Sequence, residues 1–207
     1  MRVRSEEVFL PFPGGHARRE LVPATSHVKG TWLGSEMHSL QVGGHLDAYM
    51  ERLAPDHRDT MKHSVARDWH PVSVLHAHYR ACDELGLSTA QALAFGETST
   101  RHAQGTVLAL TARIAASTAA TPWTILAQLQ RFWDRFMRGG GVAVWRLGPK
   151  EARVEVVGFP GCAYRFGATG TRGVVQGALS LFCTRLHATE IPALASPTCM
   201  GIRLAWA

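Results

Sequence analysis

The sequence predicts an α+β fold, in which a helical N-terminal half precedes strand-strand-helix-strand-strand with a small antiparallel sheet. Two observations predict this order. Between residues 30 and 136 apolar side chains recur at spacings of three and four, as on one face of a helix. From residue 142 the spacing changes to two, as in a strand. The chain has 207 residues, 46% of them apolar and 18% charged, which is enough for one full hydrophobic core.

Residues 1–28 are expected to form an N-terminal arm. The run Phe9-Leu-Pro-Phe-Pro-Gly-Gly contains two prolines and two glycines, which exclude a regular helix. Its apolar side chains can dock either on the domain or on a protein partner. Residues 29–207 are predicted to form a single α+β domain of the ligand-binding kind.

The helical spacing from Gly30 predicts two short helices, separated by the pair Gly43-Gly44. A third helix is expected to start at Pro71, because the first helical position needs no backbone N–H, and to stop at Gly86.

Ser88 and Gln91 have the spacing of a capping box, which predicts the start of a further helix. Residues 106–118 are apolar on nearly all sides, as in a central buried helix. Thr121-Pro122 is expected to begin a helix over 122–138, which Gly139-Gly-Gly ends.

The second half of the chain then predicts a hairpin, a helix and two strands. Residues 142–147 and 153–157 alternate on either side of the turn Gly148-Pro-Lys-Glu. Residues 172–186 return to helical spacing. The last two strands are expected at residues 187–191 and 200–206.

Charge and cysteine spacing exclude several classes of function. The net charge of +6 comes from residues 131–207, which carry 10 basic and 4 acidic residues without a basic run, so a nucleic-acid partner is not expected. The four cysteines have no CxxC spacing, and we expect them to be reduced and mostly buried. No apolar run reaches the roughly 18 residues of a membrane span, and no secretion signal opens the chain, so a cytoplasmic protein is predicted.

The C-terminal third resembles the 4-vinyl reductase domain in its element order and in two stretches. These are Gly173-Val-Val-Gln-Gly-Ala-Leu-Ser-Leu-Phe-Cys-Thr-Arg-Leu-His-Ala-Thr-Glu-Ile and Cys199-Met-Gly-Ile-Arg-Leu-Ala-Trp. That family belongs to a small-molecule-binding superfamily that includes the haem-dependent nitric-oxide sensors and Golgi transport-particle subunits. The resemblance covers residues 121–207 and, more loosely, the helical half. The chain is most similar to a bacterial family of about this length.

The resemblance implies a homodimeric sensory or binding domain whose ligand lies between the helices and one face of the sheet. Zinc-binding relatives carry an acidic residue followed by a cysteine, and a second cysteine eight residues later. Glu190 and Cys199 fit that pattern, but Ile191 stands where the first cysteine belongs. The axial histidine of the haem sensors is not assigned to any one histidine of this chain.

Histidines cluster between residues 57 and 78, and His70, His76 and His78 are candidate ligands for a metal or haem iron. On a helix that starts at Pro71, His76 and His78 point about 200° apart and do not chelate one ion. In an extended segment they would share a face. The alternative to a metal site is a set of surface or hydrogen-bonded histidines.

Aromatic residues gather around the predicted cleft between helix 122–138 and the hairpin, as in a mostly apolar pocket with a few polar groups. Core packing is the alternative explanation. The candidate ligand-binding residues are Trp69, His76, Tyr79, Phe132, Phe136, Trp145, Tyr164 and Phe166.

A glycine-rich stretch over residues 167–173 precedes the predicted helix 172–186, so Gly170 and Arg172 are candidates for an anion site at its N-terminus, or simply for a flexible connection. No catalytic residues are predicted. Cys82 beside Asp83 and an upstream histidine has a spacing that any helix shows, and no GxSxG motif is present.

Three functions follow from the sequence. The leading prediction is a non-enzymatic small-molecule-binding or sensory module that takes a small hydrophobic or aromatic ligand. The second is a metal-dependent or haem-dependent protein or enzyme that uses His70, His76 and His78 with zinc or haem. The third is a protein-interaction adaptor that uses the arm 1–28.

Overall fold

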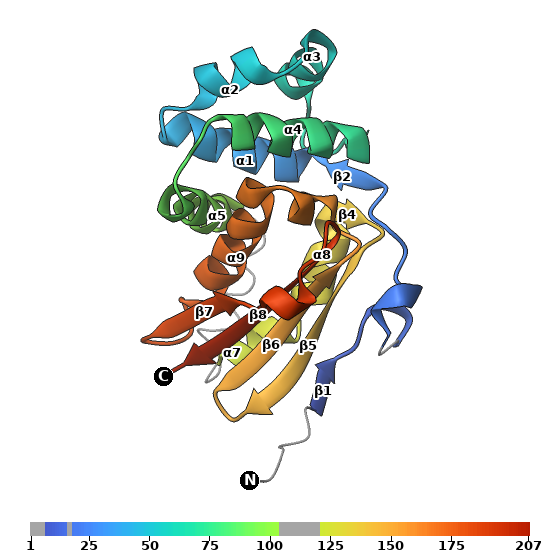
Figure 1. Cartoon of the computed structure of the whole chain (residues 1–207), viewed down its shortest axis with the longest axis vertical. Helices are drawn as coiled ribbons and strands as arrows, with labels where there is room; N and C mark the ends of the chain where they lie inside the picture. The colour runs from blue at the N-terminus through green and yellow to red at the C-terminus, as the bar shows by residue number, and fades with distance from the viewer. Residues whose placement is uncertain (1–6, 16–17, 104–120) are drawn as a thin grey trace.

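The computed structural model describes residues 7–15, 18–103 and 121–207 (Figure 1). Its element order confirms the predicted α+β class, although the predicted arm supplies the first strand of the antiparallel sheet, Glu7–Leu10, ahead of the helices. The α-helices are α1 (Gly30–Val42), α2 (Leu46–Arg52), α3 (Pro55–His63), α4 (Val72–Glu84), α5 (Thr89–Ala103), α7 (Pro122–Leu126), α8 (Leu129–Phe136) and α9 (Arg165–Leu179). Short 3-10 turns are η1 (Pro13–Gly15), η2 (Arg19–Leu21), η3 (Pro160–Ala163) and η4 (Pro192–Leu194).

Eight strands form two sheets in the described part of the chain. The larger has the order β1-β5-β6-β8-β7 and is antiparallel throughout. The smaller has the order β3-β2-β4. The strands are β1 (Glu7–Leu10), β2 (His27–Lys29), β3 (Trp69–Pro71), β4 (Met137–Arg138), β5 (Gly141–Gly148), β6 (Glu151–Val157), β7 (Leu186–Glu190) and β8 (Cys199–Trp206).

The five-stranded sheet has a helix-covered face and an arm-covered face. Because side chains alternate along β5, Val142 and Val144 join the main core, while Ala143 and Trp145 point to the other side. On that side Phe12, only 2% exposed, packs edge-on against Trp145 at 5.7 Å. Phe12 of the arm therefore docks on the domain itself, whereas Val8 and Leu21 of the arm stay exposed.

Helices α5 and α9 pack very closely, and glycines make this possible. A Cβ placed on Gly96 of α5 would lie 2.0 Å from the carbonyl oxygen of Gly170, and one on Gly173 would lie 2.2 Å from the carbonyl oxygen of Leu93. The sequence predicts this helix over residues 172–186, but α9 already begins at Arg165, so the glycines of residues 167–173 lie inside the helix.

The N-terminus of α9 is held by a side chain from α4. The Asp83 carboxylate accepts hydrogen bonds from the backbone N–H of Phe166 at 2.7 Å and of Arg165 at 3.0 Å. These two donors have no partner within the helix, so a carboxylate at this point stabilises the helix start. This contact fixes α9 relative to the helical half.

Two predicted helix starts are confirmed by their hydrogen bonds. Gln91 Oε1 accepts from the backbone N–H of Ser88 at 2.9 Å, and the Ser88 hydroxyl accepts from the backbone N–H of Gln91. Thr121 and Thr124 form a capping box at α7. Pro71 is the residue before α4 rather than its first residue. The predicted helix over residues 106–118 lies outside the described residues.

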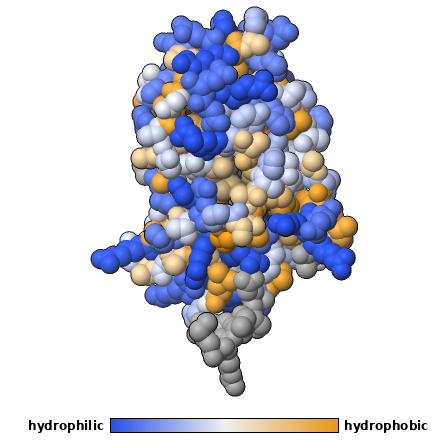
Figure 2. Space-filling model, in the orientation of Figure 1, coloured by the Kyte–Doolittle hydropathy of each residue, from blue (hydrophilic) through white to orange (hydrophobic). Residues whose placement is uncertain are grey.

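The upper surface over α2 and α3 is mainly hydrophilic (Figure 2). Within the described residues, no helix combines the length and hydropathy needed to cross a membrane.

Candidate functional site

An apolar cavity of about 140 Å³ lies between the helices and the sheet. Helices α1, α5, α8 and α9 form its walls together with α7, and β5 and β6 contribute three valines. Its lining residues are Trp32, Ser35, Ser99, Thr100, Ile125, Leu129, Phe132, Trp133, Phe136, Met137, Val142, Val154, Val156, Thr171, Val174, Val175 and Ala178. No charged side chain is among these described lining residues.

The hydroxyl groups in the wall are bonded to the protein. Ser35 Oγ donates to the Trp32 carbonyl oxygen at 2.8 Å, and Thr171 Oγ1 donates to the Gly167 carbonyl oxygen at 2.8 Å. Thr100 Oγ1 lies 3.0 Å and 3.1 Å from two carbonyl oxygens, those of Gly96 and Val174. Helical Ser and Thr side chains commonly bond in this way to the preceding turn.

The other hydroxyl and indole protons in the wall are also donated to acceptors in the protein. The Ser39 hydroxyl donates to the Ser35 carbonyl oxygen at 3.0 Å, so in the 2.9 Å contact between the two hydroxyls Ser99 is the donor. The indole N–H of Trp133 donates to the Gly139 carbonyl oxygen at 2.9 Å, and that of Trp32 donates to the Tyr79 hydroxyl at 3.3 Å. The lining residues that the structure describes therefore offer apolar contact rather than hydrogen-bond donors.

Of the eight predicted ligand-binding residues, Phe132 and Phe136 line this cavity. Trp145 lies on the opposite face of the sheet, because its neighbours Val142 and Val144 occupy the cavity side. Tyr79 and Phe166 belong to the core between α4, α5 and α9, where their ring centroids are 6.4 Å apart.

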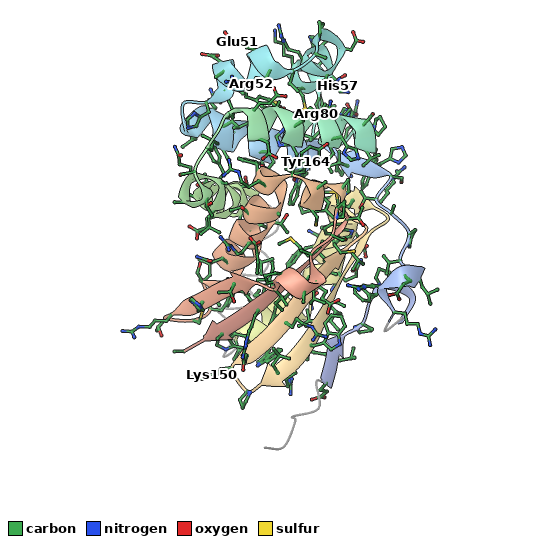
Figure 3. The ribbon with its side chains drawn as sticks, viewed as in Figure 1. Glu51, Arg52, His57, Arg80, Lys150 and Tyr164 are labelled. Atoms are coloured by element: carbon green, nitrogen blue, oxygen red, sulfur yellow. The ribbon has the colours of Figure 1, made fainter. Side chains whose placement is uncertain are left out.

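Trp69, His76 and Tyr164 also lie away from the cavity. Trp69 is in the small sheet, with the guanidinium of Arg138 4.4 Å from its ring centroid. Tyr164, just before α9, lies beside α4, where its hydroxyl is 3.1 Å from His76 Nδ1 (Figure 3).

The three histidines predicted as metal ligands do not come together. His70 Nε2 hydrogen-bonds to Ser64 at 2.8 Å, and His76 and His78 lie on different sides of α4 with separate partners. Residues two apart on a helix point about 200° apart, which accounts for the separation. Among the described residues no group of three His, Cys, Asp or Glu side chains is close enough to hold a metal ion.

His78 instead belongs to a buried polar cluster with Glu36, Tyr49 and Cys82. Its Nδ1 is 2.8 Å from the Tyr49 hydroxyl, and its Nε2 is 3.9 Å from Glu36 Oε2 and 3.8 Å from Cys82 Sγ. Burial raises the pKa of Tyr49 well above its usual value, and electrostatic interactions with Cys82 and Glu36 act in the same direction. This cluster joins α1, α2 and α4 into one unit.

The thiol of Cys82 is not a nucleophile in this setting. Burial raises the pKa of Cys82 well above its usual value, and the charges of Glu36 and Asp83 act in the same direction. Burial also raises the pKa of Cys162 to about 12, with smaller contributions from Cys199 and Glu190. Since the thiolate is the reactive form, both thiols are expected to be unreactive near neutral pH.

Alkylation with iodoacetamide at pH 8 tests this expectation. Cys82 is fully buried and Cys199 is half-buried, so we expect Cys199 to be modified at least about tenfold faster than Cys82 in the folded protein. In denaturant all of these rates should converge. Peptide mass spectrometry after timed quenching gives each rate, and early labelling of Cys82 would contradict the burial that the structure shows.

The predicted anion site at Gly170 and Arg172 is wrong. Both residues lie within α9 rather than at its N-terminus, so their backbone N–H groups are used in the helix. The Arg172 guanidinium pairs with Glu190 Oε1 at 3.4 Å. Gly170 instead contributes the backbone carbonyl group against which Gly96 of α5 packs.

Sequence reasoning missed the lining residues on α1, α5 and α9, such as Trp32, Ser99 and Val174. These residues line the cavity because faces of helices that are far apart in the sequence pack next to one another in the fold. The apolar face of α9 was visible in the sequence, but nothing in its spacing indicates that it borders a cavity.

No protein-family model and no curated protein matches the chain. Solved structures of H-NOX proteins do match it. A variant of the Fe(II) unliganded H-NOX protein from K. algicida aligns at 11% identity with a TM-score of 0.63, covering 86% of this chain and 96% of that chain. A mutant H-NOX from T. Tengcongensis aligns at 9% identity with a TM-score of 0.59, covering 86% and 97%.

A third match is an oxygen-binding H-NOX domain described as related to soluble guanylate cyclases, at 11% identity and a TM-score of 0.56, covering 86% of this chain and 94% of that chain. At this identity the likeness shows the fold alone. The chain therefore has the H-NOX fold, which agrees with the haem-sensor branch of the predicted superfamily. The resemblance to 4-vinyl reductase domains stays a prediction.

The described cavity residues do not fit a haem. Haem iron is usually held by the side chain of His, Cys, Met or Tyr, and of these only Met137 is among the described lining residues. None of those residues is an Arg or Lys that would pair with the propionate groups. The shared fold is therefore not matched by a haem-binding residue set in the described part of this chain.

Proposed function

We propose that this protein is a non-enzymatic small-molecule-binding module whose ligand occupies the apolar cavity between helices α1, α5, α8 and α9 and the sheet. The observation that carries the proposal is the cavity itself, with its aromatic residues Phe132 and Phe136 and no charged side chain among its described lining residues. A concave apolar site of this kind is the usual form of a small-molecule site.

The fold supports the same function. The matched H-NOX structures include one described as an oxygen complex. In this chain the corresponding activity is proposed to be binding and signalling, with residues 29–207 as the single binding unit and the arm packed on its sheet. Homodimerisation and a cytoplasmic location stay predictions.

The two alternative functions have less support. A metal site built from His70, His76 and His78 requires side chains that the structure keeps apart. An adaptor that presents the arm to a partner requires accessible apolar residues; Val8 and Leu21 are exposed, but Phe12 is buried against Trp145.

Filling the cavity tests the proposal. Ala178 lines the cavity from α9, so the ring in Ala178→Phe is expected to occupy ligand space and weaken toluene binding at least about tenfold. Isothermal titration calorimetry with toluene measures the loss. Ala90→Phe places the same ring at an exposed position of α5 and should leave the affinity unchanged.

Thermal unfolding of both variants checks whether each remains folded. Unchanged toluene binding by a folded Ala178→Phe protein would place the ligand elsewhere, and the absence of toluene binding by the unmodified protein would count directly against the proposal.

A further inference from the structure

The chemistry of the cavity wall restricts the ligand class, and this inference rests on the proposed function. Six polar side chains are among the described lining residues: Trp32, Ser35, Ser99, Thr100, Trp133 and Thr171. Each carries one proton on oxygen or nitrogen. Every one of these protons is directed to a protein acceptor in the contacts described above.

The described part of the wall therefore has no hydrogen-bond donor left for a ligand. A carbonyl, carboxylate or phosphate that entered would lose its bonds to water and gain none, and an unpaired buried polar group is strongly unfavourable. An anionic group would also lack a cation, because the described lining residues include no Lys, Arg or His. A hydrocarbon ligand carries no hydrogen-bonding group, so its burial does not have this unfavourable cost.

The size of the cavity gives a second restriction. An engineered apolar cavity of about 150 Å³ lined by Leu, Ile and Phe binds benzene or xenon. The cavity here, at about 140 Å³, has comparable size and similar walls. Valines from the sheet and aromatic rings from the helices line different sides of the cavity, so they can contact a flat molecule on several sides.

We infer that the cavity selects a small uncharged hydrocarbon-like molecule, of about one aromatic ring with short alkyl or alkenyl substituents, and rejects molecules of the same shape that carry a hydrogen-bond acceptor. Haem is outside this class, since its propionates are charged acceptors and its iron requires a ligand. The selectivity arises because the hydroxyl and indole protons of the described lining residues on α1, α5, α8 and α9 are already donated to acceptors in the protein.

The test uses two molecules of nearly identical shape and the full chain. α-Methylstyrene and acetophenone differ in the replacement of a CH₂ group by oxygen, so the acceptor is the main difference between them. Calorimetric titration of each is expected to give an affinity for acetophenone that is about ten- to a hundredfold weaker, since the carbonyl oxygen stays unpaired. Benzoate, which adds a charge, should bind more weakly still.

A variant that supplies a donor serves as the matched control. Val154 lines the cavity from β6, and a threonine hydroxyl in a strand has no preceding helical turn to bond to. In Val154→Thr the ratio between the two affinities is expected to fall at least about threefold, through tighter binding of acetophenone relative to α-methylstyrene.

Four outcomes separate this inference from the proposed function. Binding of α-methylstyrene with much weaker acetophenone supports both. Equal or tighter binding of acetophenone or benzoate by the unmodified chain overturns the inference and leaves the proposed function standing. Stoichiometric uptake of added haemin, followed by its absorption band, also overturns the inference. If no member of the series binds, the proposed function itself fails.

Discussion

Gly96→Ala is expected to destabilise the protein by about 3 kcal/mol, at the upper end of the cost of overpacking. The added Cβ would lie 2.0 Å from the carbonyl oxygen of Gly170 and 2.8 Å from the backbone nitrogen of Val174. Both contacts are to backbone atoms, which cannot rotate away, so α5 and α9 must separate. Chemical denaturation followed by circular dichroism measures the change in the free energy of unfolding.

Gly170→Ala is the matched control on the facing helix. The nearest atom to its added Cβ, the carbonyl oxygen of Ala92, is 4.0 Å away, so no backbone has to move. Alanine favours a helix over glycine by up to about 1 kcal/mol, and this variant should be as stable as the parent or slightly more so. Equal destabilisation by both substitutions would contradict the close packing of α5 on α9.

His78→Ala is expected to cost about 4 kcal/mol, because it leaves the Tyr49 hydroxyl and the Glu36 carboxyl buried without their partner. His78 is fully buried, and Glu36 is 5% exposed. The lost imidazole also leaves a void between α1, α2 and α4. The free energy of unfolding from urea titration measures the loss.

His76→Ala, two residues earlier on α4, is the comparison. His76 is half-buried and its side chain has one described hydrogen bond, to the Tyr164 hydroxyl. Its loss should cost about 1 kcal/mol. If the two histidine variants are equally stable, the Glu36–His78–Tyr49 contacts do not hold the helical half together.

The fold was largely predictable because it depends on local patterns. The change from helical spacing to alternation near residue 142 marks the boundary between the helical half and the hairpin, and capping residues at Ser88 and Thr121 mark helix starts. The sequence predicts one helix over residues 122–138, but the structure divides this segment into α7 and α8 and places Met137–Arg138 in β4. A second error lies at residues 167–173, where the glycines indicate a loop. In the structure the same residues permit helix contact, and contact between distant helices leaves no local signal.

The site was only partly predictable. Phe132 and Phe136 were visible as an apolar stripe beside the hairpin, and they line the cavity. Trp145 was grouped with them because it is near in sequence and aromatic, but alternation along β5 turns it to the other face. The buried role of Glu36 could not be anticipated, since its partner His78 lies 42 positions away on another helix.

The most direct test of the central claim is a ¹⁵N–¹H NMR titration of the labelled full chain with α-methylstyrene. We expect saturable shifts confined to the cavity walls, at Ser99 and Thr100 of α5, in α8, and at Val174 and Ala178 of α9. Residues of the arm-covered face, such as Trp145, should not move. Shifts centred on that face, or no saturable shift at all, would contradict the assignment of this cavity as the binding site.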